Sequence, residues 1–272
     1  MALDASLRDT AAERLGEIAL EAGRLLRGLE GTTTEHQIKD DGSPTTAADL
    51  AAERLILRRL HETWPGIPVV AEETASHAAV GAMFFLVDPL DGTKDFLSGR
   101  GEYTVNIALV SGHRPVAAAV CAPAMGLAWR AGSRAEATRD GVTWTPIRTR
   151  AVPSSGLVAL VSRRHDDHES EECLARLHVT ERRAASSALK FCLIAQGDGD
   201  VYVRCGPTME WDTAAGDHVL TCAGGCVVGP DGGPIRYGDH DARYRNRPFA
   251  AFGTPASAAG LCLPPACQGW TS

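Results

Sequence analysis

The sequence predicts a protein of the mixed α+β or α/β class, because three kinds of pattern follow one another along its 272 residues. Two amphipathic helical segments come first, and short apolar runs bounded by Gly and Pro come next. Strand-like and helix-like runs then alternate in the last part. The boundary falls best in the stretch 149–156. We therefore predict an N-terminal lobe of residues 1–150 and a C-terminal lobe of residues 151–272.

The composition argues against some classes of function. Apolar residues make up 44% and charged residues 22% of the chain, as in a soluble globular protein. The formal net charge is −7 and the basic residues are scattered apart from short clusters, whereas a nucleic-acid scaffold needs a basic stripe. We therefore expect no nucleic-acid partner. A small anionic substrate is compatible with this charge, because bound cations reverse the local field.

The eight cysteines form no metal or disulfide pattern. No pair has the CxxC spacing of a zinc site and no signal peptide is evident, which favours free thiols in a reducing setting. No apolar run approaches the length of a transmembrane span. We expect a cytoplasmic protein without a transmembrane segment, and these observations leave peripheral membrane association open.

The first two segments of the chain predict a helix and a loop. Over residues 5–29, apolar side chains recur at steps of three and four, which predicts an amphipathic helix that packs on a core. Residues 32–44 are polar and contain glycine, so we expect a loop or hairpin there.

A second helix is predicted after this loop. Ser43 or Thr45 is expected to cap its start, and Asp49 falls in its first turn, where a carboxylate complements the helix dipole. The expected apolar stripe comprises Leu50, Leu57, Leu60 and Trp64.

Two short apolar runs, both predicted to be strands, end in acidic residues. The run at 67–71 is followed by Glu72 and Glu73, and the run at 83–87 is followed by Asp88. Adjacent carboxylates repel each other. This repulsion would be relieved either by solvent screening, if the residues lie on the surface, or by a positively charged partner, if they lie in a site.

The remaining elements follow from similar patterns. Apolar runs bounded by Gly and Pro predict strands at 103–110, 115–121 and 126–131, as in an antiparallel meander, and another strand at 145–150. In the C-terminal lobe we expect strands at 157–161 and 201–204, and helices at 163–177, 186–196 and 213–224. The tail from residue 255 has no assignable pattern.

The stretch LVDPLDGTKDF at 86–96 is the most informative part of the chain. Asp88 ends a strand, a Pro-Leu turn follows, and Asp91 is expected at a helix N-cap, before Gly92 and Thr93 with their unpaired backbone N–H groups. Carboxylate oxygens hold hard cations, and such N–H groups hold a phosphate. On its own the stretch is also explained by an ordinary turn, because Asp-Pro and Asp-Gly are common turn dipeptides.

Five carboxylates lie at or near the ends of predicted elements: Asp49, Glu72, Asp88, Asp91 and Asp212. Asp212 is a plausible N-cap of the helix that follows it. Helix capping explains a single one of these carboxylates easily, but it does not readily explain all five. If the carboxylates converge, their repulsion would raise some pKa values unless divalent ions lay between them. Oxygen-only ligands indicate Mg²⁺ or Mn²⁺ rather than zinc.

Three motifs resemble those of a known superfamily. PVVAEE (68–73), LVDPLDGTKDF (86–96) and WDTAAGD (211–217) are similar to the motifs of the lithium-sensitive, magnesium-dependent phosphomonoesterases that include inositol monophosphatase and fructose-1,6-bisphosphatase. GEYTVNIALV (101–110) and the segment 189–220 most resemble, within that superfamily, the CysQ-type 3'(2'),5'-bisphosphate nucleotidases. The resemblance spans residues 8–240.

The resemblance implies a fold and a separate role for each of the two lobes. The fold would be a layered α-β-α-β-α sandwich, in which an antiparallel sheet with the N-terminal helices precedes a smaller mixed sheet. The N-terminal lobe would carry most metal ligands, and the C-terminal lobe would close the substrate site. A homodimer is a further expectation from the resemblance.

The resemblance also implies roles for single residues. Two or three Mg²⁺ ions, with Mn²⁺ as a substitute, would be held by Glu72, Asp88, the carbonyl of Leu90, Asp91 and Asp212. Gly92 and Thr93 would bind the phosphate that is cleaved. Asp49 with Thr93 would orient the attacking water, and Glu72 would share in catalysis. Glu73 and Asp49 would lie beside these ligands or form a third metal site.

Residues of the C-terminal lobe would receive the nucleotide. These are Ser187, Lys190 and Arg204, with His165 as a further candidate. The full implied substrate contact set is Glu72, Leu90, Asp91, Gly92, Thr93, Ser187, Lys190, Arg204 and Asp212. The substrate would be a small phosphorylated nucleotide.

The expected reaction is removal of the 3'-phosphate of adenosine 3',5'-bisphosphate by metal-activated water, giving AMP and phosphate. The alternative is the same chemistry on inositol or other sugar phosphates. Lys190 and Arg204 favour the first, because a second substrate phosphate needs cations. A non-catalytic metal- or phosphate-binding module would be expected to lack a ligand, and none is missing. A third interpretation is that the acids only cap helices.

Overall fold

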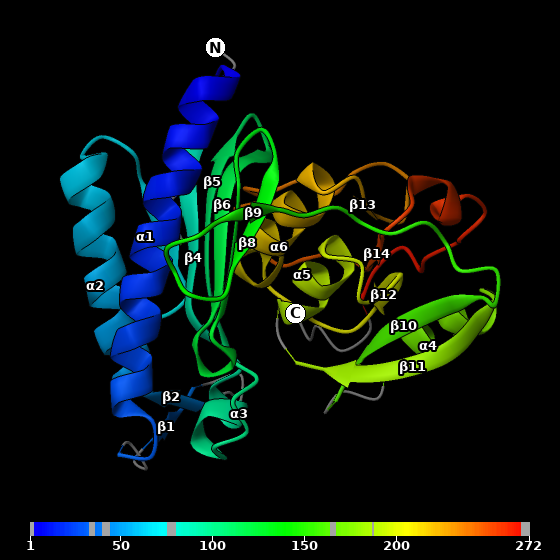
Figure 1. Ribbon diagram of the computed structural model, residues 1–272, viewed down its shortest axis with the longest axis horizontal. Helices are drawn as coiled ribbons and strands as arrows, with labels where there is room; N and C mark the ends of the chain where they lie inside the picture. The colour runs from blue at the N-terminus through cyan, green and yellow to red at the C-terminus, as the bar shows by residue number, and fades with distance from the viewer. Residues whose placement is uncertain are drawn as a thin grey trace.

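Helices and sheets alternate in five layers across the molecule (Figure 1). The computed structural model describes residues 3–32, 36–39, 44–74, 80–163, 167–186 and 188–267. The order of layers is two long helices, a seven-stranded sheet, two shorter helices, a five-stranded sheet and a last short helix. The predicted layered α-β-α-β-α sandwich is confirmed.

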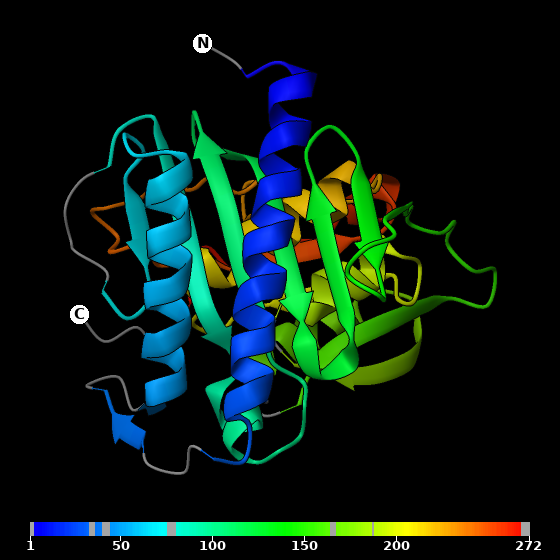
Figure 2. The ribbon, with the colours of Figure 1, turned by 60° about the vertical axis from the view of Figure 1, so that its left-hand side comes forward.

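The first layer begins with α1 (Ala5–Leu29), as predicted. The carboxylate of Asp4 caps this helix by accepting a hydrogen bond from the N–H of Leu7 at 2.9 Å. Its apolar stripe is buried against the large sheet, and α1 lies beside the second helix across one face of that sheet (Figure 2).

The second helix, α2 (Ala47–Thr63), follows a short hairpin of β1 (His36–Ile38) and β2 (Pro44–Thr46). Its N-cap is Thr46, so the expectation of a cap at Thr45 is wrong, and Ser43 lies outside the described residues.

The predicted apolar stripe of α2 is wrong at one position. Leu50 is exposed, because small residues and not leucines face the sheet at the start of the helix. The buried apolar residues of α2 are Ala48, Ala52, Ile56 and Leu60.

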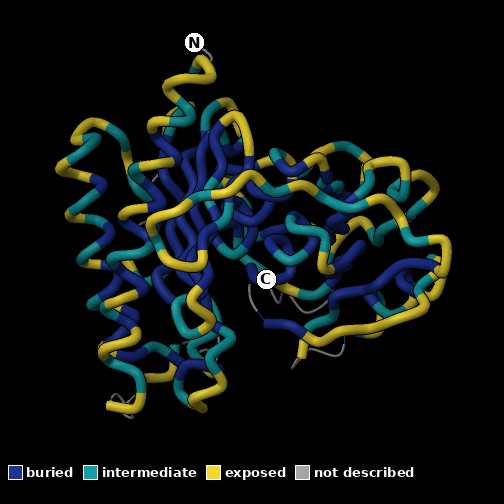
Figure 3. Tube along the Cα trace, viewed as in Figure 1, coloured by how far each residue is buried: buried dark blue, intermediate teal, exposed yellow. Residues whose placement is uncertain are grey.

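The large sheet is antiparallel except for one parallel pair at its edge. In spatial order its strands are β3 (Val69–Ala71), β4 (Met83–Asp91), β5 (Thr104–Ser111), β6 (Arg114–Ala122), β7 (Leu127–Ala131), β8 (Ala135–Thr138) and β9 (Thr145–Pro146). The first two strands run parallel. Helices cover both faces, so the central strands are buried along most of their length (Figure 3).

The chain does not turn after Asp88 as predicted. β4 continues to Asp91, with a shift in its pairing to β5 between the two aspartates. A short helix, α3 (Thr93–Leu97), follows. Its N-cap is Gly92 with φ at 97°, so Asp91 is not the cap. Only glycine adopts this left-handed conformation without strain.

The middle layer consists of α5 (Leu189–Ala195) and α6 (Glu210–Cys222). A Cβ atom placed on Gly216 of α6 would lie 2.6 Å from the ring of Phe191 on α5. The two helices therefore approach more closely than any side chain at this position allows.

Replacing Gly216 by Ala is expected to lower the free energy of unfolding by about 1–3 kcal/mol, because extra atoms in a packed core displace their neighbours. The matched control is Gly28→Ala in α1, where no atom lies within 4 Å of the added Cβ. That substitution is expected to stabilise the protein by up to about 1 kcal/mol, since Ala favours a helix. Denaturant unfolding measures both, and a similar change in the two variants would contradict the close approach.

The small sheet and its helix complete the layers. Its strands, in spatial order, are β11 (Val179–Ala185), β10 (Leu157–Ser162), β12 (Val201–Arg204), β14 (Phe249–Phe252) and β13 (Cys226–Val228). β10 runs parallel to β11 and β12, and β14 is antiparallel to its neighbours. Outside it lies α4 (His168–Ala175), with Asp167 as its N-cap, so the helix predicted over 163–177 starts too early and ends too late; its residues 164–166 lie outside the described residues. Short 3₁₀ turns at Pro123–Met125 and Pro255–Ala258 complete the structure.

Four strands were not predicted, namely β8, β11, β13 and β14. The strand expected at 145–150 is limited to Thr145–Pro146. One apolar core joins the large sheet, α5, α6 and the small sheet. The division into lobes at residue 150 stays a prediction.

All eight cysteines are free, and Cys121, Cys173, Cys192 and Cys205 are buried. Among the described helices, none is both long and apolar enough to span a bilayer.

Candidate active site

Two acidic residues are brought together by the parallel pair at the edge of the large sheet. Ala71 of β3 pairs with Val87 of β4, and the next residues along the two strands are Glu72 and Asp88. The N–H of Glu72 also donates to the carbonyl of Val87 at 3.1 Å. The two carboxylates therefore start from adjacent backbone positions.

Asp91 and Asp212 complete this acidic cluster of four. Burial, and then the negative charges of Glu72, Asp91 and Asp212, raise the pKa of Asp88 well above its usual value. Burial and the charge of Asp91 do the same to the pKa of Asp212. Residues from two separate parts of the chain therefore repel one another in a common site, as the sequence led us to expect.

Asp212 reaches the cluster from the first turn of α6. The N-cap of that helix is Met209, whose N–H donates to the Asp212 carboxylate at 2.8 Å. The prediction that Asp212 is itself the cap is wrong, because the helix begins earlier in the sequence.

Lys39, which sequence analysis did not select, neutralises part of the cluster. Its Nζ lies 2.7 Å from Glu72 Oε1 and 2.7 Å from Glu73 Oε1. Burial opposes its charge, but the two carboxylates outweigh burial and raise the pKa of Lys39. No signal in the sequence distinguishes this lysine, which follows the short strand β1 in a polar segment.

Oxygen donors from the cluster fit a hard cation in their chemistry, and their mutual repulsion is what a bound cation would relieve. In the present arrangement, the described residues contain no group of three or more His, Cys, Asp or Glu side chains placed to hold one ion. Binding of an ion by three of these carboxylates therefore requires side-chain movement, and Glu72 can serve as a ligand only if Lys39 releases it.

The charge on Glu72 is expected to destabilise the metal-free protein at alkaline pH. Burial raises its pKa to about 7 from the usual 4.5, although Lys39 opposes the shift. The folded state thus binds a proton that the unfolded chain has lost, so stability falls as the pH rises from about 5 to above 7. We expect Glu72→Gln to unfold at a higher temperature than the wild type at pH 8 in EDTA. This advantage should shrink at pH 5, and a variant that is less stable at pH 8 would contradict the assignment.

Asp49 and Thr93 form a hydrogen-bonded pair beside the cluster. The Thr93 hydroxyl lies 3.0 Å from Asp49 Oδ1 and 3.2 Å from the carbonyl oxygen of Leu90. The other oxygen of Asp49 accepts hydrogen bonds from the N–H and hydroxyl of Thr46. Burial raises the pKa of Asp49. The predicted pair is therefore brought together, with its carboxylate held rigidly at the start of α2.

Glu73 lies on the other side of Lys39. Thr45 donates to Glu73 Oε2 at 2.9 Å, and the N–H of Glu73 donates to Glu53 Oε2 at 2.8 Å. Glu53 is 1% exposed and burial raises its pKa. Glu53 was not predicted from the sequence, because its position among charged residues of a helix is typical of a solvent-exposed side chain.

Gly92 and Thr93 lie where a helix leaves backbone N–H groups unpaired. The first N–H groups of α3 have no intrahelical acceptors. The carbonyl of Gly92 accepts from the N–H groups of Asp95 and Phe96 at 2.8 and 3.0 Å, which fixes the turn.

Two buried cations lie within electrostatic range of the acidic cluster. Lys190 on α5 is 3% exposed and Arg204 on β12 is 6% exposed. Burial lowers the pKa of Lys190 to about 8; Arg204 lowers it too, while Asp91 opposes the shift. The Lys190 ammonium lies 4.7 Å from the centre of the Tyr202 ring. Two adjacent buried cations of this kind are suited to bind an anionic group.

The middle layer is tied directly to the cluster. Asp91 Oδ2 accepts a hydrogen bond from the N–H of Ala188 at 2.8 Å, and the Asn106 amide donates to the same oxygen at 3.4 Å. Asn106 is buried on β5, opposite Asp88. It was missed because a lone polar residue in an apolar strand does not reveal its partner.

Two predicted substrate residues, Ser187 and His165, lie outside the described residues.

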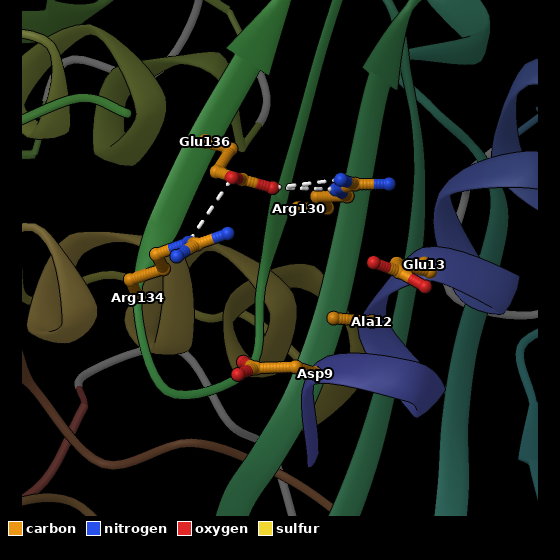
Figure 4. A pocket seen from close by; sticks show the side chains of 7 residues that line it. Asp9, Ala12, Glu13, Arg130, Arg134 and Glu136 are labelled. Atoms are coloured by element: carbon orange, nitrogen blue, oxygen red, sulfur yellow. Dashed lines mark hydrogen bonds and ion pairs between the residues drawn. The ribbon is translucent and has the colours of Figure 1, made fainter. Parts of the chain in front are cut away.

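A separate pocket between α1 and the β7–β8 hairpin contains none of these residues (Figure 4). Its lining is Asp9, Ala12, Glu13, Arg130, Gly132, Arg134 and Glu136. Arg130 and Arg134 both pair with Glu136, at 2.8 and 3.1 Å (Figure 4). The guanidinium charges there are already compensated, so this pocket is not the candidate site.

Known proteins match both the chain and its fold. The model of the inositol monophosphatase family matches residues 7–259. The 3'(2'),5'-bisphosphate nucleotidase CysQ of Escherichia coli K12 is 36% identical over 230 residues, which cover 83% of this chain and 93% of that protein. The enzyme of the same name from Shigella flexneri is 38% identical over 239 residues, with the same coverage.

A solved structure agrees with these matches. The crystal structure of CysQ from Bacteroides thetaiotaomicron, described as a bacterial member of the inositol monophosphatase family, superimposes with a TM-score of 0.75 at 31% identity. The superposition covers 89% of this chain and 97% of that one.

Proposed function

The chain belongs to the inositol monophosphatase family and, by its similarity to the CysQ enzymes, is a 3'(2'),5'-bisphosphate nucleotidase; from this premise we propose that it removes the 3'-phosphate of adenosine 3',5'-bisphosphate. The products are AMP and phosphate. The enzyme is a magnesium-dependent phosphatase of nucleotide bisphosphates. The single observation that carries the finer proposal is the pair of buried cations, Lys190 and Arg204, next to the acidic cluster.

In this proposal the ions are held by oxygen atoms alone. The ligands are Glu72, Asp88, the carbonyl of Leu90, Asp91 and Asp212. Two ions suffice for the reaction, with a third beside Glu73, and Mn²⁺ can replace Mg²⁺. When bound, the ions lower the pKa of water and stabilise the leaving oxygen. The raised pKa values of Asp88 and Asp212 support the assignment, because a nearby positive charge lowers them again.

Asp49 and Thr93 orient the attacking water. The Thr93 hydroxyl donates a hydrogen bond to Asp49 at 3.0 Å, so its oxygen lone pairs face the water and accept a hydrogen bond from it. Asp49 is held by two bonds from Thr46, so the pair does not need to reorganise during the reaction. No covalent intermediate with a side chain is required.

The N–H groups of Gly92 and Thr93 hold the phosphate that is cleaved. They belong to the N-cap and the first residue of α3, where a helix leaves its backbone N–H donors without intrahelical acceptors. Donors fixed in this way favour the oxygens on which charge accumulates in the transition state.

Lys190 and Arg204 receive the second phosphate of the substrate. The depressed pKa of Lys190 reflects burial next to another cation, and a phosphate dianion between them would compensate both charges. Ser187 and His165 are proposed to complete this contact on the strength of the resemblance alone.

Phosphate release from a panel of substrates at equal concentration tests the proposal. With Mg²⁺, we expect kcat/KM for adenosine 3',5'-bisphosphate to exceed that for inositol 1-phosphate by at least about tenfold, the discrimination of one buried charge-assisted contact. Preference for inositol 1-phosphate would establish the alternative function on sugar phosphates.

A homodimer is a further proposal from the same resemblance, whereas a cytoplasmic location and a two-lobe division near residue 150 are proposals from the sequence pattern. Light scattering coupled to size-exclusion chromatography tests the first, since a monomer mass of 28.8 kDa would refute it.

A further inference from the structure

A partly buried carboxylate, Glu102, connects the large sheet to the small one near the candidate substrate site. It lies between α3 and β5, and nothing in the proposed mechanism uses it. Its Oε1 accepts a hydrogen bond from the Arg163 guanidinium at 2.7 Å, and its Oε2 accepts from the N–H of Ser186 at 3.1 Å. The same guanidinium nitrogen donates to the carbonyl of Ala184 at 3.0 Å.

These contacts gather the ends of two parallel strands. Ser162 of β10 pairs with Ala185 of β11, and Arg163 and Ser186 are the next residues along each strand. Glu102 therefore binds both strand ends at once, from the loop that precedes β5 of the large sheet. Its side chain is 22% exposed and that of Arg163 is 32% exposed, so solvent weakens this ion pair only in part.

The position of Lys190 depends on the segment that Glu102 holds. The Lys190 ammonium donates to the carbonyl of Ala185 at 3.3 Å, and Ala185 directly precedes Ser186, whose N–H contacts Glu102. Asp91 holds the next part of this segment through the N–H of Ala188 at 2.8 Å. The carboxylate of Glu102 also favours the charged form of Lys190, which places the two side chains within electrostatic range.

We propose that Glu102, through its bond to Ser186 and its ion pair with Arg163, is a positioning residue that sets Lys190 against the second phosphate of the substrate. It thereby favours bisphosphates over monophosphates. This inference rests on the proposed function, since it concerns the specificity of that same site.

Glu102→Gln and Arg163→Gln, alone and together, test this role with two matched substrates. Adenosine 3',5'-bisphosphate carries the second phosphate, and adenosine 3'-phosphate lacks it. For either single variant we expect KM for the bisphosphate to rise about tenfold, the loss of one charge-assisted hydrogen bond. We expect kcat to stay within about twofold, and KM for the monophosphate likewise. The double variant should resemble the singles, because the two residues act as one unit.

A second measurement does not depend on turnover. AMP retains the second phosphate, so calorimetry in EDTA is expected to give a Kd for AMP about tenfold higher in Glu102→Gln than in the wild type. The matched control is Arg182→Gln on β11, which removes an exposed ion pair with Glu171 of α4. It should leave both KM and Kd unchanged.

An equal rise in KM for the two substrates would show that Glu102 only supports the fold, and would overturn the proposal. Unchanged KM and Kd values in the variants would also overturn it. Should Glu102→Gln fail to fold, Arg163→Gln decides between these outcomes. Failure of the proposed function has a different signature, because the wild type would then show no preference for the bisphosphate.

Discussion

Replacing Asp91 by Asn is expected to lower kcat/KM for adenosine 3',5'-bisphosphate by about a thousandfold or more. Metal ions stabilise the charge of such a reaction by several kcal/mol, and about 1.4 kcal/mol corresponds to a factor of ten. Asn still accepts the hydrogen bond from Ala188, so the fold should persist. Calorimetry should show weaker Mg²⁺ binding, and thermal unfolding in EDTA should show no large loss of stability.

The control for this substitution is Asp95→Asn on α3. Asp95 is also buried, but it pairs with Arg100 at 3.5 Å and lies outside the acidic cluster. It should leave Mg²⁺ affinity unchanged. Unchanged phosphate release in Asp91→Asn would favour a non-catalytic binding module. A change in stability without a change in Mg²⁺ affinity would favour simple structural capping.

Replacing Lys190 by Met is expected to raise KM for the bisphosphate by about a hundredfold, since a buried charge-assisted contact to a dianion contributes about 3 kcal/mol. The KM for adenosine 3'-phosphate should change far less. The free protein should unfold at a higher temperature, because burial disfavours the Lys190 ammonium and Met removes this penalty.

The pH dependence provides a further check on Lys190. Its pKa of about 8 lies below the usual 10.5, so the folded protein loses this charge as the pH rises through 8. KM for the bisphosphate should therefore rise above pH 8 in the wild type and not in Lys190→Met. Equal effects on both substrates would instead place Lys190 against the phosphate that is cleaved.

Periodicity and turn residues were sufficient to predict α1, the meander β5–β7 and the strands β10 and β12. These patterns failed to predict strands that are short or charged, and they failed at strand ends that depend on pairing with a neighbouring strand. Asp88 and Pro89 have the sequence of a turn, yet pairing with β5 keeps β4 extended to Asp91. The exposed, charged strand β11 has no apolar alternation, so no pattern marks it.

The candidate site was predictable to a different degree. Its carboxylates were selected from motifs and from apolar runs that are followed by acids, and Glu72 and Asp88 do directly follow the paired residues Ala71 and Val87 of two parallel strands. The residues that contact these carboxylates, or that order the segments around them, were not predictable. Lys39, Asn106 and Glu102 act through contacts across 15 to 84 positions of sequence, and only the folded chain reveals such contacts.

The metal site is tested most directly by a crystal structure of the protein grown with Mn²⁺, whose anomalous scattering locates the ion. We predict one or more Mn²⁺ peaks at about 2.0–2.3 Å from carboxylate oxygens of Asp88, Asp91 and Asp212, with Lys39 displaced from Glu72. Mn²⁺ bound elsewhere, with these three carboxylates directed into separate regions, would contradict it.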